Sequence, residues 1–411
     1  MNSPKTSVKI AKKQPSPLME GTLTKKKVFW SNKYIDPDAG KKGCWVISKE
    51  IEKNNEGVEN GATKLLNEAS HIIRANKSNT PIKGLYAHCF GFEQKKNKIY
   101  AYFKFYWDGQ TMGDLLRNIK IDFNTYERAE QFLFKILFRN FYKNRKIPVA
   151  DDYWEKMFFD RIARRIKVTK HLISGDPTIK VEFNVLKKSI ENGFYLNDKF
   201  YSPIQKYLDI LRTNKKFIKS INPAYAQETH QDLNVNDVVV HFSRPSNKIT
   251  EFKLIDPRGN NETGPRYRHF YYDAGKWMFV NDGLDIYRLH NKELFKRYGE
   301  SLTLNYSEDS IIPRFYFRIN ENHPIVNRYK KARSRFISML ESLTEFAWFK
   351  QDHPNWVKAI NLSEACMYIP DVPCRIITDS HNNPKIAIAA YLRGVELLDR
   401  FINAYMQKSD T

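Results

Sequence analysis

The chain has 411 residues, of which 41% are apolar and 14% aromatic, so a substantial folded core is expected and a disordered chain is not. No run of about 18 apolar residues occurs, which argues against a membrane-spanning helix. The four cysteines match neither a zinc module nor a CxxC redox pair, which favours a protein of the reducing cytoplasm.

The 68 basic and 46 acidic residues give a net charge of +22, which favours a polyanionic partner such as a nucleotide, a nucleic acid or an anionic lipid surface. The alternative is that the charge mainly confers solubility, because runs such as Lys25-Lys26-Lys27 and Lys95-Lys96 are typical of solvated turns and strand edges. Net charge alone does not decide between these two interpretations.

The first part of the chain is predicted to be rich in strands. Residues 1–19 are basic and polar, with no apolar stretch behind them, and indicate a flexible tail. Apolar alternation and turn residues within 20–107 then predict strands around one helix. These strands are expected at 28–30, 44–47, 85–92 and 99–106, and the helix at 62–75.

After residue 108 the pattern becomes mainly helical. Phe134, Leu137, Phe138 and Phe141 follow the i, i+3, i+4, i+7 spacing of an amphipathic helix within 126–144. Further helices are predicted at 151–172, 199–214, 266–290, 324–345, 354–369 and 383–406, with a hairpin at 301–318. The predicted fold is therefore α+β, with a small strand-rich part followed by a larger helical part.

The segment with the clearest chemistry is 229–259. It contains HQDL at 230–233, then Asn236-Asp237 before an apolar stretch, and Asp256 after a second apolar stretch. Two short strands joined by a turn would place these oxygen-bearing side chains at matching ends. Such hard oxygen ligands suit a Mg²⁺ ion on a nucleotide phosphate chain. A further carboxylate nearby can orient an acceptor hydroxyl and accept its proton.

This segment resembles a known family. HxDL, a metal ligand a few residues later, an apolar strand and IDPRG at 255–259 are similar to the active-site segment of aminoglycoside phosphotransferases and choline kinase-like small-molecule kinases. The similarity is nearest to a bacterial branch associated with sugar-nucleotide and surface-polysaccharide biosynthesis, in which IDPRG precedes a helix carrying YDLAK. Here YDAGK occupies 272–276. The resemblance extends to YWEK at 153–156 and to 364–398, but only 229–276 is specific.

The resemblance implies a protein-kinase-like fold of two lobes. The N-lobe would be 20–107, and the helical C-lobe would be 108–411 with its catalytic loop at 229–259. Asp232 would be the catalytic base, Asp256 would bind Mg²⁺, and Asp273 would hold the catalytic loop in place.

The resemblance also assigns an ATP site to the N-lobe. Lys49 would contact the nucleotide phosphates and Glu68 would pair with it. Without the downstream motif, Lys41, Lys42 and Lys53 are equal candidates. Adenine would lie against the strand at 102–106 and form hydrogen bonds with the backbone near Phe105, Tyr106 and Trp107.

Three departures from the family pattern affect this assignment. Asp237 stands where the family has asparagine, with Asn236 one residue earlier, so either could be the metal ligand. Gln231 replaces the usual glycine after the histidine. No glycine-rich phosphate loop is evident, because Gly21 and Gly43 are isolated.

Two further residues of the segment have expected roles. His230 is expected to be a packed loop residue, and Arg258 either a phosphate contact or half of a structural salt bridge.

The leading hypothesis is an ATP- and Mg²⁺-dependent phosphotransferase acting on the hydroxyl of a small molecule, with a sugar as one candidate. A second hypothesis is a kinase-fold protein that binds nucleotide without small-molecule kinase activity, either as a pseudokinase or as a protein-modifying enzyme. A third is a basic nucleic-acid-binding protein, although the sequence contains no recognisable nucleic-acid-binding motif.

Overall fold

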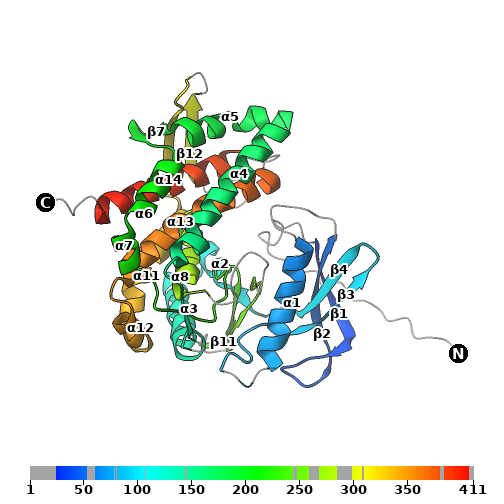
Figure 1. Ribbon diagram of the computed structural model, residues 1–411. Coiled ribbons are helices and arrows are strands. Elements are labelled where there is room, and N and C mark those ends of the chain that lie inside the picture. The colour runs from blue at the N-terminus through cyan, green and yellow to red at the C-terminus, as the bar shows by residue number, and fades with distance from the viewer. Residues whose placement is uncertain are drawn as a thin grey trace. The chain divides into compact units, whose positions relative to one another are not determined.

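The computed structural model describes residues 25–52, 61–77, 79, 81–106, 108–143, 146–243, 248–258, 268–284, 299–307, 310–379 and 384–406. They form an α+β protein that is rich in strands towards the N-terminus and helical towards the C-terminus (Figure 1). The described residues pack as two compact units. The first draws on the described residues within 25–114, 230–232 and 236–258, and the second on those within 115–229, 233–235 and 268–406.

The first unit contains a four-stranded antiparallel sheet with one helix against it. In sheet order the strands are β1 (Lys25–Ile35), β2 (Lys42–Glu52), β4 (Lys98–Lys104) and β3 (Cys89–Lys95), and the helix is α1 (Gly61–Lys77) (Figure 1). The buried residues Ile47, Lys49 and Ile51 alternate along β2, which puts them on one face of the sheet. That face carries a lysine towards α1.

A second, smaller sheet belongs to the same unit. Its strands are β11 (Ile249–Leu254), β10 (Val238–Phe242) and β5 (Gln110–Thr111), in that order. The N–H of Ala87 donates to the carbonyl of Leu254 (2.9 Å), and the N–H of Leu254 donates to the carbonyl of Leu85 (2.8 Å). These bonds attach the β10–β11 hairpin to the strand-rich unit, whereas the predicted lobes place 229–259 with the helical part.

The second unit is mainly helical. Its helices are α3 (Phe123–Ile136), α4 (Asp160–Gly175), α5 (Pro177–Asn192), α6 (Ile204–Thr213), α7 (Lys215–Ser220), α8 (Phe270–Phe279), α11 (Pro324–Ser342), α12 (Ala347–Asp352), α13 (Trp356–Asp379) and α14 (Lys385–Tyr405), and α2 (Met112–Arg117) precedes them. Turns of π-helix occupy Leu137–Phe141, Glu155–Phe159 and Val280–Leu284, and a 3₁₀ turn occupies Thr344–Phe346.

The helical unit also holds two small sheets. One has the order β12 (Leu302–Ser307), β13 (Arg314–Ile319), β7 (Phe194–Leu196) and β8 (Lys199–Tyr201), and the other joins β6 (Ile147–Pro148) to β9 (Tyr225–Ala226). β12 and β13 confirm the predicted hairpin at 301–318. The predicted helix at 199–214 was wrong at its start, because Asn197 and Asp198 adopt positive φ angles of 47° and 65°. Such a pair favours a tight hairpin turn, so 199–201 form a strand.

The centre of the helical unit is α13, which packs against α4, α8 and α14. Two glycines allow these contacts to be close. A Cβ atom on Gly275 of α8 would lie 2.2 Å from Oγ of Ser363, and one on Gly394 of α14 would lie 2.8 Å from Cβ of Tyr368. α13 also contains Pro370 and Pro373 within its length.

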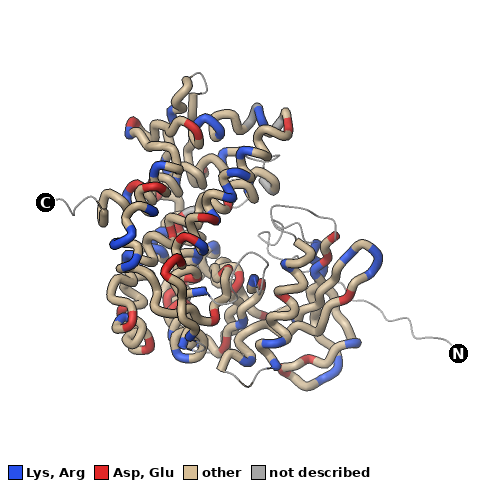
Figure 2. Tube along the Cα trace, viewed as in Figure 1, with Lys and Arg blue, Asp and Glu red and all other residues tan. Residues whose placement is uncertain are grey.

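The described helices include none that is both long and apolar enough to cross a membrane. All four cysteines are free thiols. Lys and Arg occur on helices and strands of both units, with Asp and Glu interspersed among them (Figure 2).

Candidate functional site

Lys49 and Glu68, predicted as a pair, lie in contact in the first unit. Lys49 of β2 is opposite Ala101 of β4, and its ammonium lies 4.9 Å from the centre of the Phe103 ring. Nζ of Lys49 is 2.5 Å from Oε1 of Glu68. Glu68 is on the buried face of α1, so the packing of that helix on the sheet delivers its carboxylate to the lysine.

Asp256 joins this pair from the end of β11. Its Oδ1 accepts a hydrogen bond from Nζ of Lys49, and its Oδ2 lies 3.7 Å from Nζ of Lys26. The Asp256 side chain is 31% exposed, and its φ of 57° is in the left-handed region. Asp tolerates that region better than most residues, but at some cost in strain. Residues far apart in the sequence therefore form one cluster: Lys26, Lys49, Glu68 and Asp256.

Lys26 was missed by the sequence analysis, which treated Lys25-Lys26-Lys27 as solvated. Ile35 pairs with Lys42 beside the turn, and an unbroken register from that pair would put Val28 opposite Lys49. The register shifts between Ser31 and Ile35, and this shift brings Lys26 opposite Lys49 instead. A strand irregularity of this kind has no clear signal in a single sequence.

Burial and the neighbouring charges shift the pKa values of Asp256, Lys49 and Glu68 by different amounts. Burial opposes ionisation of Asp256, but the ammonium groups of Lys49 and Lys26 hold the pKa of that carboxyl well below its usual range. Burial also opposes protonation of Lys49, yet Asp256 and Glu68 raise the pKa of the lysine. Burial raises the pKa of Glu68 to about 7 against the attraction of Lys49. Asp256 is therefore the stronger partner of Lys49.

Asp256 and Asp232 both lie close enough to Asp237 to interact with it electrostatically. Burial, followed by the charges of Asp256 and Asp232, raises the pKa of Asp237 well above its ordinary value. The carbonyl of Asp237 accepts the N–H of Ile255 (2.9 Å), which fixes the start of β10 beside the residue that precedes Asp256. Asn236, the other predicted ligand, is half-buried next to Asp237.

No group of three or more His, Cys, Asp or Glu side chains in the described ranges is arranged to hold a metal ion. Mg²⁺ on a nucleotide commonly takes one or two carboxylates and completes its shell with phosphate and water. The carboxylates of Asp237 and Asp256 fit that requirement in type and number.

The HQDL segment is built around a neutral histidine. His230 is 1% exposed, and its Nε2 lies 2.8 Å from the carbonyl of Ile255, so Nε2 carries the proton and donates. Burial lowers the pKa of His230 to about 4. The next residue, Gln231, has a φ of 66°. This left-handed conformation explains why a glycine suits the position and why glutamine adopts it only with strain.

Asp232, the predicted base, is held by an arginine of the IDPRG segment. Nε of Arg258 lies 3.1 Å from Oδ2 of Asp232, and both side chains are largely buried. The sequence left Arg258 open as a phosphate contact or half of a salt bridge, and the structure gives the salt bridge. The bond restricts the orientation of the Asp232 carboxylate.

The predicted adenine strand is described only in part. The N–H of Phe105 donates to the carbonyl of Trp45 (2.9 Å), and the carbonyl of Tyr106 accepts the N–H of Gly109 (3.2 Å). Both backbone groups are thus engaged within the protein. Trp107 lies outside the described residues.

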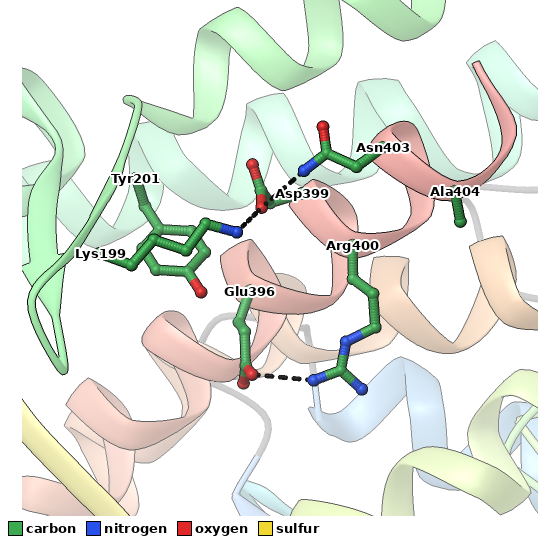
Figure 3. Close-up of a pocket in the computed structure, with 7 residues that line it drawn as sticks. All are labelled: Lys199, Tyr201, Glu396, Asp399, Arg400, Asn403 and Ala404. Carbon is green, nitrogen blue, oxygen red and sulfur yellow. Dashed lines mark hydrogen bonds and ion pairs between the residues drawn. The ribbon is translucent and has the colours of Figure 1, made fainter. Parts of the chain in front are cut away.

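A separate pocket of about 420 Å³ lies in the helical unit (Figure 3). Lys199 and Asn403 both contact Asp399 (2.6 and 3.0 Å), and Arg400 pairs with Glu396 (3.0 Å). The polar side chains drawn in Figure 3 thus bond largely to one another. None of the site residues predicted from the sequence lines this pocket.

Comparison of the sequence with protein-family models gave no match, and a search of curated proteins found no significant match.

Proposed function

We propose that the protein is an ATP- and Mg²⁺-dependent phosphotransferase with a protein-kinase-like fold, which moves the γ-phosphoryl group to a hydroxyl of a small molecule. The observation that carries the proposal is the contact of Lys49 with both Glu68 and Asp256. A lysine held by a helix carboxylate, beside a metal-binding aspartate, is the arrangement that positions nucleotide phosphates in kinases.

Each residue of the cluster has a role in this proposal. Lys49 donates hydrogen bonds to phosphate oxygens, and Glu68 keeps its ammonium in place. Asp256 and Asp237 would hold Mg²⁺, which would neutralise charge on the phosphate chain. Asp237 is proposed as the second ligand over the uncharged Asn236, because its carbonyl accepts the N–H of Ile255, the residue before Asp256, and because a carboxylate is the harder, charged oxygen ligand for Mg²⁺.

Asp232 is the proposed base. Arg258 contacts Oδ2 of Asp232 and orients the carboxylate, which accepts the proton of the acceptor hydroxyl as that oxygen attacks the γ-phosphorus. The bond between the γ-phosphorus and the bridging oxygen breaks, and ADP leaves. The net charge of +22 favours a neutral or anionic acceptor, such as a sugar, over a polycation.

Calorimetric titration of ATP with and without Mg²⁺ tests the proposal in wild type and Asp256→Ala. We expect Mg²⁺-dependent binding in the wild type and its loss in the variant. A panel of sugars is then assayed for ADP release, with Asp232→Asn as the inactive control. Failure of folded wild-type protein to bind ATP would contradict the proposal.

A second candidate function is nucleotide binding without small-molecule phosphorylation. The strained Gln231 (φ 66°) favours it, since a long side chain stands beside Asp232 where the family has glycine. Mg²⁺-dependent ATP binding without turnover of any small hydroxyl acceptor would select this candidate.

A further inference from the structure

Lys26 and Lys49 form a cross-strand pair of like charges. They are direct register partners on β1 and β2, so their side chains leave the same face of the sheet. Both side chains are largely buried, with exposed fractions of 11% and 8%. Like charges directly opposite each other destabilise a sheet, and the pair therefore requires an anion beside it.

In the structure that anion is the Asp256 carboxylate. One oxygen accepts a hydrogen bond from Lys49, and the other lies 3.7 Å from the ammonium of Lys26. Lys49 has a second partner in Glu68. For Lys26, the pair with Asp256 is the only ion pair within the described ranges. A ligand that draws Asp256 away, such as a Mg²⁺–nucleotide, must therefore supply Lys26 with another negative charge.

The turn between β1 and β2 is not suited to binding the phosphate chain of a nucleotide. It carries the carboxylates of Asp36 and Asp38, which contact Lys104. The backbone N–H groups of Asp38 and Ala39 donate to Oδ1 of Asp36, at 2.9 and 3.3 Å. Because these donors are engaged and the turn is acidic, it cannot cradle phosphate as a glycine-rich loop does.

We propose that Lys26 is a second phosphate-binding lysine, which forms with Lys49 a two-lysine clamp on the phosphate chain of a nucleoside di- or triphosphate. The inference deepens the proposed function and rests on it. In this clamp, strand side chains supply the positive charge that backbone N–H groups supply in a glycine-rich loop. The Asp256 carboxylate lies between the ammonium groups, where phosphate oxygens would be held.

The test compares wild type with Lys26→Met, because methionine keeps an unbranched apolar side chain and removes the charge. Binding of ATP, adenosine and tripolyphosphate is measured by calorimetry in the presence of Mg²⁺. We expect the Kd for ATP and tripolyphosphate to rise about tenfold to a hundredfold, as one charge-assisted contact is lost. Adenosine binding should stay unchanged, an outcome that a merely structural role of Lys26 would not give.

Two further variants sharpen the comparison. Lys27 is exposed and follows Lys26 on the strand, so its side chain leaves the other face. Lys27→Met should therefore bind all three ligands as wild type does. Lys26→Arg keeps the charge and should recover most of the affinity for tripolyphosphate. Thermal unfolding of all three variants confirms that they are folded.

The outcomes separate this inference from the proposed function. If wild type binds Mg²⁺–ATP and Lys26→Met binds it equally well, the function stands and the clamp is overturned. If wild type binds tripolyphosphate through Lys26 but does not bind ATP, the clamp stands as a polyanion site and the nucleotide function fails. If folded wild type binds neither ligand, both are overturned.

Discussion

The two units each contain a buried cluster of acidic and basic side chains, but the clusters differ in kind. In the helical unit, Asp282 accepts hydrogen bonds from Arg393 (2.8 Å) and from the hydroxyl of Tyr368 (3.0 Å). Arg333 pairs with Glu364 at 2.6 Å and lies 3.7 Å from Asp282. These residues come from α11, α13, α14 and the π-helical turn after α8, so the cluster ties four elements together.

The cluster around Asp256 is less buried, and its charges are less fully compensated. The Asp282 side chain is 3% exposed, whereas that of Asp256 is 31% exposed. Asp282 lies in a helical turn between arginines that hold its pKa far below the usual range although burial opposes the shift. Asp256 has a left-handed backbone and interacts with the carboxyl group of Asp237, whose pKa is raised. Buried ion pairs alone therefore do not indicate a site. Partial exposure, backbone strain and unrelieved repulsion distinguish the candidate site.

The largest expected effect is a loss of catalysis on mutation of the Asp256 cluster, which would distinguish it from the structural cluster around Asp282. In the proposed phosphotransferase, Asp256→Ala should lower kcat for phosphoryl transfer about 10³- to 10⁵-fold, or about 4 to 7 kcal/mol, because the proposed Mg²⁺ would lose a ligand. ADP release in a coupled assay measures this change. Glu251→Ala, at an exposed carboxylate of β11, the strand that precedes Asp256, should retain wild-type activity. If Asp256→Ala were as active as the wild type, the cluster around Asp256 would be structural, like the one around Asp282.

Asp282→Ala should instead act on stability. Removing one partner of a buried network leaves the arginines without their counter-charge, which costs about 3 to 5 kcal/mol. Urea unfolding followed by far-ultraviolet circular dichroism measures the loss. The exposed Glu341 of α11 gives the control Glu341→Ala, which should change stability by less than about 0.5 kcal/mol. An Asp282→Ala protein of wild-type stability would contradict the structural role.

The helical unit should also lose stability in acid through a histidine pair. Nε2 of His269 lies 3.2 Å from Nε2 of His353, and Nδ1 of His269 accepts the N–H of Tyr271, so His269 donates its Nε2 proton to His353. Burial lowers the pKa of His353 to about 4 and that of His269 well below its ordinary value. The unfolded chain, with a histidine pKa near 6.5, binds more protons than the folded protein between these values.

Stability should therefore be full above about pH 6.5 and fall towards pH 4, by about 3 kcal/mol for His353. Urea unfolding at a series of pH values measures the slope. His353→Gln should flatten it, whereas His171→Gln, at an exposed position of α4, should leave it unchanged. An identical slope in His353→Gln and wild type would show that this pair does not titrate on unfolding.

The smallest effect is expected at Gly275. Its added Cβ would lie 2.2 Å from Oγ and 2.8 Å from the backbone carbon of Ser363, so α8 and α13 must separate. Gly275→Ala should cost about 1 to 3 kcal/mol, measured by thermal unfolding. Gly175→Ala is the control, because nothing lies within 4 Å of its added Cβ. Equal unfolding temperatures of the two variants would contradict close packing at Gly275.

The strand-rich part of the fold could be predicted because its signals are local. Alternation along β2 and the apolar face of α1 are visible in the sequence, and the Lys49–Glu68 pair followed from the resemblance. Lys26 could not be found, because its position depends on a register shift within β1. The role of Arg258 stayed open for a similar reason, since only the folded loop brings its guanidinium to Asp232.

Some missed elements did leave a sequence signal. α5 was not predicted, although Asp176 precedes Pro177 and its carboxylate accepts the N–H of Ile179. An aspartate cap before a proline in the first turn is a recognised start of a helix. The Asn197-Asp198 turn is a similar case, because the helical periodicity of the residues after it outweighed the turn signal.

The prolines of α13 have a consequence for folding. Pro370 and Pro373 each remove a backbone donor from the helix interior, at a cost of about 3 kcal/mol for each in an isolated helix. The helix at the centre of this unit is therefore a poor helix on its own, and it forms only where α4, α8 and α14 surround it. The formation of α13 is therefore expected to accompany its packing against these helices, with little of this helix formed in advance of tertiary contacts.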